Sequence, residues 1–153
     1  GQPDYSAFEG GEGELYSSAI VMRRASNRRP GSSMSAPADG KPILPLDLLR
    51  NKRFAFNSED SMSGIIALTR DLTAIGETPE IFSERIQSGG HRNSIIAVAE
   101  GRADVAAIDC RSWALAQRFE PRAAEVEVIG WTGLRKGLPY IAGLDAPVTT
   151  LPD

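Results

Sequence analysis

Thiol and imidazole groups are almost absent from this sequence, whose 153 residues include one cysteine, Cys110, and one histidine, His91. A single cysteine leaves no partner for an internal disulfide, so cysteine usage says nothing about the compartment. Zinc and similar metals need several spaced His, Cys or carboxylate ligands, which one histidine and one cysteine do not supply. We therefore expect neither a metal site nor a cofactor.

Long apolar runs and an excess of positive charge are also missing. No run approaches the roughly 18 apolar residues of a membrane-spanning helix. The amino end has no basic-then-apolar leader pattern. If this protein is exported, we expect its leader to have been removed. The formal net charge is −3, so the chain lacks the excess of Lys and Arg that is typical of nucleic-acid-binding proteins. With 41% hydrophobic and 24% charged residues, the composition predicts one folded globular domain with no nucleic-acid partner.

The first 45 residues carry little regular pattern apart from one strand. Residues 1–13 are rich in glycine and acid and predict a tail or an irregular connection. Residues 14–24 are rich in β-branched and aromatic residues and predict a strand. Pro, Gly, Ser and Ala dominate residues 25–45, which indicates a long, exposed and flexible loop. The basic cluster beside and within this loop is interpreted as a solvated stretch, and its members are Arg23, Arg24, Arg28 and Arg29.

Helical and extended patterns alternate over the rest of the chain. This alternation predicts an α/β fold with a mainly parallel sheet and flanking helices. Gly76 and Pro121 stand where two of the helices should end. The expected helices cover residues 46–52, 65–75, 92–101 and 110–121, and the expected strands cover residues 53–57, 79–84, 103–109, 125–131 and 137–143.

The stretch “NSEDSMSG”, residues 57–64, lies between an expected strand and an expected helix. In sheets of this kind, ligands bind beyond the carboxyl ends of the strands. The stretch offers the hydroxyls of Ser61 and Ser63 and the unpaired N–H groups of a helix start, which bind anions without a lysine. The alternative is that Ser61 is only the N-cap, with surface acids beside it. No Gly-Lys-Ser/Thr pattern follows, so this is not a nucleotide phosphate loop.

His91 and Asp109 lie at two further positions of the same kind. His91 stands in the glycine-rich turn of residues 88–94, at a helix start, and a protonated imidazole donates from both nitrogens. The alternative is a histidine with an ordinary packing role. Asp109 ends a buried strand and can accept a hydrogen bond from a protonated oxygen or an amine of a ligand. A cap for the helix that begins at Cys110 is an alternative compatible with that role.

Cys110 suggests a second functional hypothesis, an enzyme. A thiol at a helix start can have a depressed pKa, and a pair with His91 would make a small Cys-His hydrolase. The competing interpretation is that Cys110 packs beside Trp113, as small buried cysteines commonly do. Iodoacetamide reactivity separates the two interpretations.

Several segments together resemble the phosphate-, phosphite- and phosphonate-type periplasmic solute-binding proteins of ABC transporters. The segments are “FAFNSEDSMSG”, “SGGHRNSIIAVAEGRADVAAIDCRSWAL” and “VIGWTGLRKGLPYIAG”, and “LYSSAIVMR” resembles the strand by which that family's chain crosses between two lobes. The resemblance implies a protein that closes on an oxyanion and hands it to a membrane permease, outside the cytoplasm. The ligand-binding positions that it implies are Ser61, Ser63, the backbone N–H of Met62, His91, Asp109 and Tyr16.

The resemblance is to part of the family's chain. It covers most of residues 14–142, and we expect residues 14–153 to form one lobe of a type 2 periplasmic-binding-protein-like fold with its hinge strands. The family's segment before the crossing strand has no counterpart here. We therefore expect a non-enzymatic, oxyanion-binding lobe, with weak binding because closure supplies the second set of contacts. The alternative is a lobe that acts as an interaction or sensor module and forms a homodimer in place of the second lobe.

Overall fold

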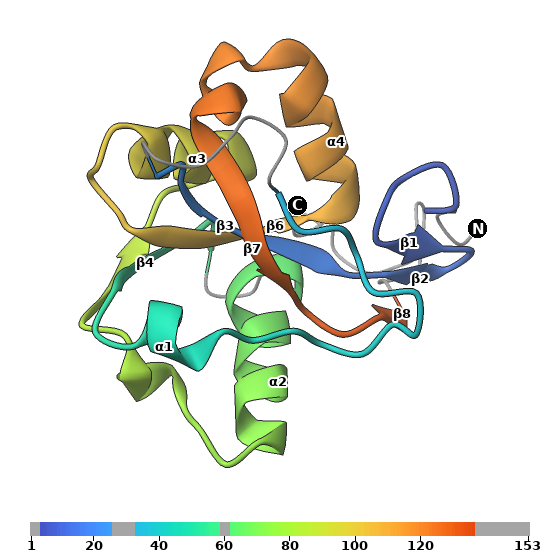
Figure 1. Ribbon diagram of the computed structural model, residues 1–153, viewed down its shortest axis with the longest axis horizontal. Coiled ribbons are helices and arrows are strands. Elements are labelled where there is room, and N and C mark those ends of the chain that lie inside the picture. The colour runs from blue at the N-terminus through green and yellow to red at the C-terminus, as the bar shows by residue number, and fades with distance from the viewer. Residues whose placement is uncertain (1–3, 26–32, 59–61, 137–153) are drawn as a thin grey trace, which may run out of the picture.

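The computed structural model describes residues 4–25, 33–58 and 62–136, apart from the side chains of Met62 and Ser63. These residues form a five-stranded sheet with helices on both faces and a small three-stranded sheet at one side (Figure 1). The strands are β1 (Gly11–Glu12), β2 (Leu15–Tyr16), β3 (Ser18–Arg23), β4 (Arg53–Phe56), β5 (Glu84–Gln87), β6 (Val105–Asp109), β7 (Val126–Trp131) and β8 (Arg135–Lys136).

The helices end where the sequence places residues that stop a helix. Gly76 has a φ of +80°, and its N–H donates to the carbonyl of Thr73 while the N–H of Glu77 donates to the carbonyl of Leu72, which is a glycine-based helix end. Pro121 opens a separate turn. The helices are α1 (Leu46–Leu49), the π-helical turn η1 (Met62–Ile66), α2 (Ala67–Ala74), the 3₁₀ turn η2 (Pro79–Ile81), α3 (His91–Ala99), α4 (Cys110–Phe119) and the 3₁₀ turn η3 (Pro121–Glu125).

The main sheet has the order β5-β4-β6-β3-β7. Strand β4 is parallel to β5 and to β6, whereas β3 is antiparallel to both of its neighbours, β6 and β7. Four strands therefore share one direction and β3 alone runs against them. The α/β class and the mainly parallel strand direction are as predicted, with one antiparallel strand in the interior of the sheet.

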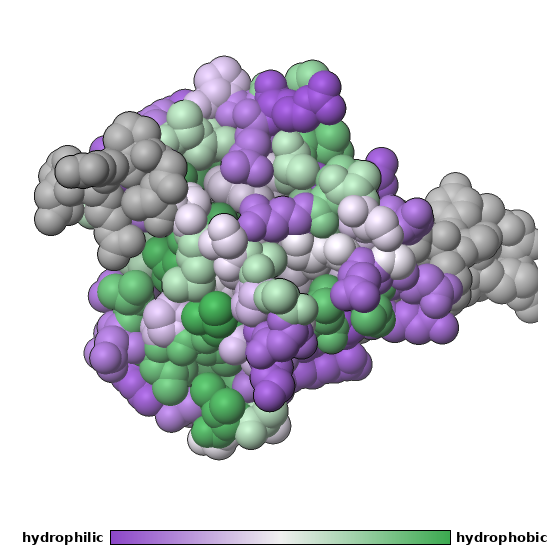
Figure 2. Space-filling view, turned by 45° about the vertical axis from the view of Figure 1, so that its right-hand side comes forward, coloured by the Kyte–Doolittle hydropathy of each residue, from purple (hydrophilic) through white to green (hydrophobic). Residues whose placement is uncertain are grey.

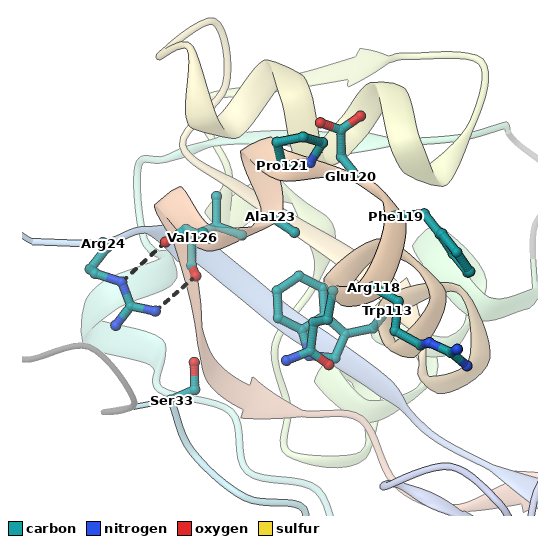
Figure 3. Close-up of a pocket in the computed structure, with 11 residues that line it drawn as sticks. Arg24, Ser33, Trp113, Arg118, Phe119, Glu120, Pro121, Ala123 and Val126 are labelled. Atoms are coloured by element: carbon teal, nitrogen blue, oxygen red, sulfur yellow. Dashed lines mark hydrogen bonds between the residues drawn. The ribbon is translucent and has the colours of Figure 1, made fainter.

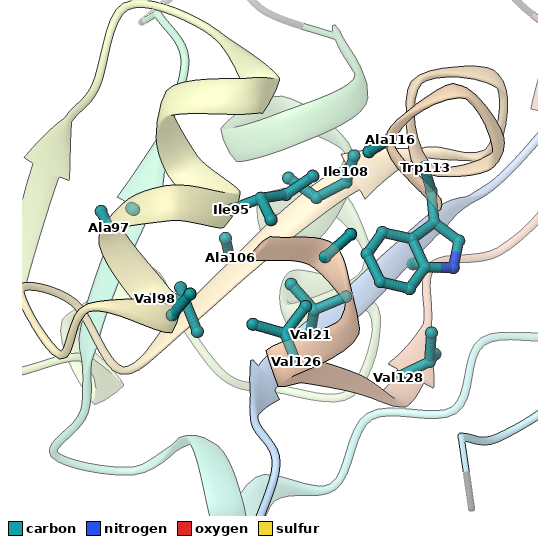
Figure 4. Close-up of a cluster of buried hydrophobic side chains, with 14 of the residues drawn as sticks. Val21, Ile95, Ala97, Val98, Ala106, Ile108, Trp113, Ala116, Val126 and Val128 are labelled. Atoms are coloured by element: carbon teal, nitrogen blue, oxygen red, sulfur yellow. The ribbon is translucent and has the colours of Figure 1, made fainter. Parts of the chain in front are cut away.

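The core has two halves, one on each face of the sheet, because side chains alternate along the buried strands. On β6, Ala106 and Ile108 point to the half that α3 and α4 cover, where they meet Ile95 and Trp113 (Figure 4). Val105 and Ala107 of the same strand point to the other half, with α2. Figure 1 shows α3 and α4 on one side of the sheet and α2 on the opposite side. The main sheet is thereby held between α3 and α4 on one face and α2 on the other.

The amino-terminal segment is more regular than its glycine content indicates. Residues 14–24 are not one strand: the chain leaves the small sheet after Tyr16 and joins the main sheet at Ser18. Residues 11 and 12 of the expected tail form β1, which pairs with β2. The rings of Tyr5 and Tyr16 lie 5.3 Å apart, so part of this segment packs on the core.

The described part of the predicted loop over residues 25–45 contains no helix and no strand of more than one residue. It is less exposed than predicted because it lies along β7, the edge strand. Ile43 exchanges two backbone hydrogen bonds with Trp131, and the N–H of Met34 donates to the carbonyl of Val128 at 2.9 Å. Trp131 Nε1 donates to the carbonyl of Met34 at 3.0 Å. These contacts satisfy polar groups that an edge strand leaves open.

Two other expectations differ from the structure or fall outside it. The strand predicted over residues 79–84 is wrong: Thr78 caps a 3₁₀ turn that starts at Pro79, and β5 begins only at Glu84. Proline at the first position of a helical turn loses no hydrogen bond, which explains why the turn forms here. The strand predicted over residues 137–143 lies outside the described residues.

The visible surface mixes polar and apolar side chains (Figure 2). The largest apolar group on this face lies in its lower part, at the height of α1 and α2 in Figure 1. Leu48 of α1 and Ile75, which directly follows α2, are among the exposed large hydrophobic residues. Among the described residues, no helix combines the length and the apolar character that crossing a membrane requires.

The close approach of the loop to β7 makes Gly130 a sensitive position. A Cβ atom there would lie 2.4 Å from the carbonyl oxygen of Ile43 and 2.9 Å from Pro45 Cδ. We expect Gly130→Ala to lower the free energy of unfolding by about 1–3 kcal/mol, because backbone must shift to admit the methyl group. Urea unfolding measures this change. Gly90→Ala is the control, since nothing lies within 4 Å of its added Cβ, and an equal loss in both variants would contradict the prediction.

Candidate anion-binding site

Three elements bring polar side chains to one edge of the sheet. Strands β4 and β6 are parallel neighbours, so Asn57, which follows β4, and Asp109, which ends β6, lie at the same edge. His91, the first residue of α3, joins them: its Nε2 lies 3.0 Å from Asp109 Oδ2 and 3.4 Å from Asn57 Nδ2. Of the positions predicted from the sequence, His91 and Asp109 are thus in direct contact.

Asp109 has the helix-cap role that the sequence allows, and it also contacts His91. Its Oδ1 accepts the N–H of Ser112 at 2.8 Å and its Oδ2 accepts the Ser112 hydroxyl at 2.7 Å, so it caps α4. The same Oδ2 faces His91. Both side chains are buried, with residue exposures of 8% for Asp109 and 7% for His91. A buried carboxylate is tolerated here because donors from two helix starts surround it.

The charge of Asp109 is stabilised in the folded chain. Burial alone raises the pKa of this carboxyl group, but hydrogen bonding and charge from His91, with the two hydrogen bonds from Ser112, outweigh it and hold the pKa below its ordinary value. The carboxylate is therefore ionised at neutral pH. It lies 3.0 Å from His91 Nε2, so the imidazole at the start of α3 is held at this edge of the sheet.

The helix after β4 begins with a π-helical turn, Met62–Ile66, that runs directly into α2. Such turns are rare and frequently occur at functional sites. Met62 and Ser63 are the first two residues of this turn, at the end of the helix where backbone N–H groups are unpaired. Ser61 lies outside the described residues. The predicted roles of these three residues stay predictions.

Tyr16 lies in the small sheet, where the crossing segment enters the main one. Its side chain is buried, and burial, together with the neighbouring Tyr5, raises the pKa of its hydroxyl well above the ordinary value, although the positive charge of Arg135 opposes this. The hydroxyl is therefore a neutral hydrogen-bond donor at all physiological pH values. Tyr16 is also close enough to Asp109 for that carboxylate to raise its pKa.

Sequence reasoning missed three residues of this region. Asn57 was the first residue of a predicted binding stretch but received no role of its own. Ser112 follows Asp109 at the three-residue spacing of a capping pair, a pattern that was available in the sequence. Tyr5 lies in the expected tail, and only the three-dimensional structure places its ring beside that of Tyr16.

Cys110 does not have the environment of a nucleophile. The residue is 1% exposed, and burial raises the pKa of its thiol to about 11. His91 Nε2 contacts Asp109 instead of a thiol. Cys110 belongs to the core half that includes Trp113. The packing interpretation is the one that agrees with the structure, and the Cys-His hydrolase lacks support.

A separate pocket of about 310 Å³ lies between the end of α4, η3 and the end of β3 (Figure 3). Arg24, from the predicted basic cluster, lines it, and its guanidinium donates to the carbonyls of Ala124 and Val126 at 3.4 Å each. At least this member of the cluster is held by the fold instead of being fully solvated. Arg28 and Arg29 lie outside the described residues.

A family model described as “ABC transporter, phosphonate, periplasmic substrate-binding protein” matches residues 7–148. This chain belongs to that family. The resemblance inferred from the sequence is therefore confirmed, and members of the family are substrate-binding components of transporters. No curated protein matches this member of the family.

Solved structures agree with this assignment. PhnD1 from Prochlorococcus marinus (MIT 9301), solved in complex with methylphosphonate, is 25% identical, with a TM-score of 0.64 over 88% of this chain and 45% of that one. A Xanthomonas citri protein solved with a chloride ion is 18% identical, with a TM-score of 0.60 over 84% of this chain and 45% of that one. A binding protein component of an ABC phosphonate transporter from Pseudomonas aeruginosa is 18% identical, with a TM-score of 0.53 over 80% of this chain and 43% of that one.

The family member described here spans less than half the length of these solved structures. Its α/β fold is the periplasmic-binding-protein fold of its neighbours, as predicted. Among the described residues, no three His, Cys, Asp or Glu side chains cluster in a way that would hold a metal ion.

The ionisation of Asp109 predicts an acid dependence of stability. Its folded pKa lies below the unfolded value, so its contribution is fully present above about pH 4 and is lost as the pH falls through the folded pKa. As the pH falls below about 4, we expect the free energy of unfolding of the wild type to fall more steeply than that of Asp109→Asn. Urea unfolding at each pH measures both slopes. The exposed Asp39→Asn serves as control and should keep the wild-type slope; the same slope in Asp109→Asn would disprove the assignment.

The buried thiol predicts slow alkylation. With a pKa of about 11, Cys110 at pH 7 holds about a hundredth or less of the thiolate of a free cysteine, and burial slows access further. Iodoacetamide should label the folded chain at least about 100-fold more slowly than the chain unfolded in urea. Mass spectrometry follows the reaction. Rapid labelling of the folded chain would contradict this prediction and support the Cys-His hydrolase.

Proposed function

We propose that this chain binds a phosphonate-class oxyanion as the ligand-binding lobe of a periplasmic substrate-binding component. The observation that carries the proposal is the family match over residues 7–148. The contact between His91 and Asp109 at one edge of the sheet supports it. The methylphosphonate complex of PhnD1 supports a ligand of the phosphonate class over other oxyanions.

The proposed chemistry uses backbone and side-chain hydrogen-bond donors together with the contact between His91 and Asp109. Backbone N–H groups at the start of η1, with the Ser61 and Ser63 hydroxyls, would donate to the oxygens of the anion. Tyr16 would add a phenolic hydroxyl, and His91 would add its imidazole. Asp109 would hold the imidazole in place and favour a ligand that itself carries a hydrogen-bond donor, such as a monoprotonated phosphonate.

Family membership also supports the remaining parts of the proposal. A substrate-binding component works outside the cytoplasm and delivers its ligand to the permease of an ABC transporter, so a permease is the proposed protein partner. The chain would perform no reaction of its own. A homodimer in place of a second lobe stays a prediction, which light scattering tests.

Nuclear magnetic resonance titration of the chain with methylphosphonate tests the function. At millimolar ligand we expect saturable shifts of the backbone amides at Met62, Ser63, His91 and Asp109, because these positions would surround the anion. Phosphate and phosphite compare related oxyanions, and sulfate and chloride report non-specific anion effects. A chain whose amides shift with none of the phosphorus oxyanions would contradict the proposal.

A matched pair of serine variants localises the site. Ser63→Ala removes one proposed hydroxyl donor and should raise the dissociation constant about tenfold, as expected for a hydrogen bond to a charged group. Ser83→Ala, on an exposed serine between η2 and β5, should leave the constant unchanged. Equal affinities for both variants would remove Ser63 from the site.

A further inference from the structure

Asp71 is an acidic residue in a position that packing would give to an apolar one. The buried residues of α2 are Ala67, Leu68, Asp71 and Leu72, which form one stripe along the helix. Leu68 and Leu72 of this stripe pack in the core half around α2, and Asp71 itself is only 7% exposed. A buried carboxylate costs free energy unless it is paired and hydrogen-bonded. The pairing of Asp71 therefore needs a structural reason.

Both partners of Asp71 come from the segment that follows β7. Arg135 Nη2 donates to Asp71 Oδ1 at 2.6 Å, and the N–H of Gly133 donates to Asp71 Oδ2 at 2.8 Å. Arg135 Nη1 reaches one turn further toward the start of α2 and donates to the carbonyl of Ala67 at 3.2 Å. We call these four residues the Asp71–Arg135 clamp. It holds the first turns of α2 to a segment more than 60 residues away in the chain.

The clamp also reaches the strand that carries Tyr16. Arg135 lies in β8, which pairs with β2, and Tyr16 is its register partner. The guanidinium is close enough to Tyr16 for its charge to act on the phenolic hydroxyl. Figure 1 shows β2 and β8 side by side at the edge of the molecule, with α2 below the sheet. The Arg135 side chain thus connects the helix that begins with η1 to the strand pair of β2 and β8.

These two parts carry the two halves of the proposed anion site. Met62 and Ser63 open the helix on one side of the clamp, and Tyr16 lies on the other. An anion held by both requires a fixed separation between them. Apolar side chains at positions 71 and 135 could hold α2 against β8 at a similar or lower free-energy cost than this buried ion pair. They would lack the directional hydrogen bonds that fix the distance between the two elements.

We infer that Asp71 and Arg135 are positioning residues for anion binding. They hold the start of the η1–α2 helix at the separation from Tyr16 that a bound phosphonate requires. Neither residue contacts the ligand in this account. The inference rests on the proposed function, and it adds that the affinity of the site is set in part by a clamp beneath it.

Two variants test the clamp. Arg135→Lys keeps the positive charge but cannot donate to Asp71 and to the Ala67 carbonyl as a fork does. The double variant Asp71→Asn with Arg135→Met removes both charges and leaves an amide oxygen for the Gly133 N–H. Folding of each variant is checked by its melting temperature. Hydrogen exchange without ligand should be faster than in the wild type at residues 62–67 and, together with them, at residues 15–18.

The control is an arginine with the same type of contacts at the opposite end of the sheet. Arg53 donates to both Asp104 oxygens, at 2.9 and 3.0 Å, and also to the carbonyls of Gly101 and Arg102. It lies at the start of β4, whereas the proposed site lies beyond the end of that strand. Arg53→Lys therefore disturbs a comparable arginine fork without touching the site.

Methylphosphonate titration at a temperature well below every melting point decides the question. We expect the dissociation constant to rise about tenfold in both clamp variants and to stay at the wild-type value in Arg53→Lys. Wild-type affinity in both clamp variants, an equal loss in Arg53→Lys, or unchanged exchange at residues 62–67 would overturn the inference. The wild type is titrated before any variant is made. If it binds no phosphonate, the proposed function is wrong and the inference falls with it.

Discussion

The pairing of β3 with β6 is the constraint on which the rest of the molecule depends. Because β3 runs antiparallel to β6, its register places Ser18 opposite Asp109, at the end of the strand where the candidate residues gather. The carbonyl of Ser17, one residue earlier, accepts the N–H of Cys110 and so fixes the first residue of α4. A shift of one residue in this pairing would turn Asp109 to the opposite face of the sheet.

Asp109 shows how one buried carboxylate can order two helix starts. Its carboxylate caps α4 through Ser112 and contacts the imidazole that opens α3, so two helix starts are connected through one buried charge. Neither helix start can move without breaking a hydrogen bond to that charge. The orientation of His91 toward the edge of the sheet is therefore a consequence of the same contacts that hold the fold together.

The sequence predicted those features that depend on neighbouring residues. Helix ends at Gly76 and Pro121 follow from local backbone preferences, and the placing of His91 and Asp109 follows from the alternation of helix and strand. Features that depend on distant partners were out of reach. The direction of β3, the covering of β7 by residues 33–45, and the pairing of Asp71 with Arg135 are decided by contacts between segments far apart in the chain.

The loop along β7 has a consequence for how this sheet meets other chains. A strand edge with open N–H and C=O groups is a template for intermolecular pairing, and residues 33–43 already occupy that template on β7 at Val128 and Trp131. The opposite edge, β5, is four residues long and carries Glu84 and Arg85. A short charged edge is a poor template for a growing aggregate. Within the described residues, the sheet is thus protected at both sides against strand addition, by coverage on one side and by charge on the other.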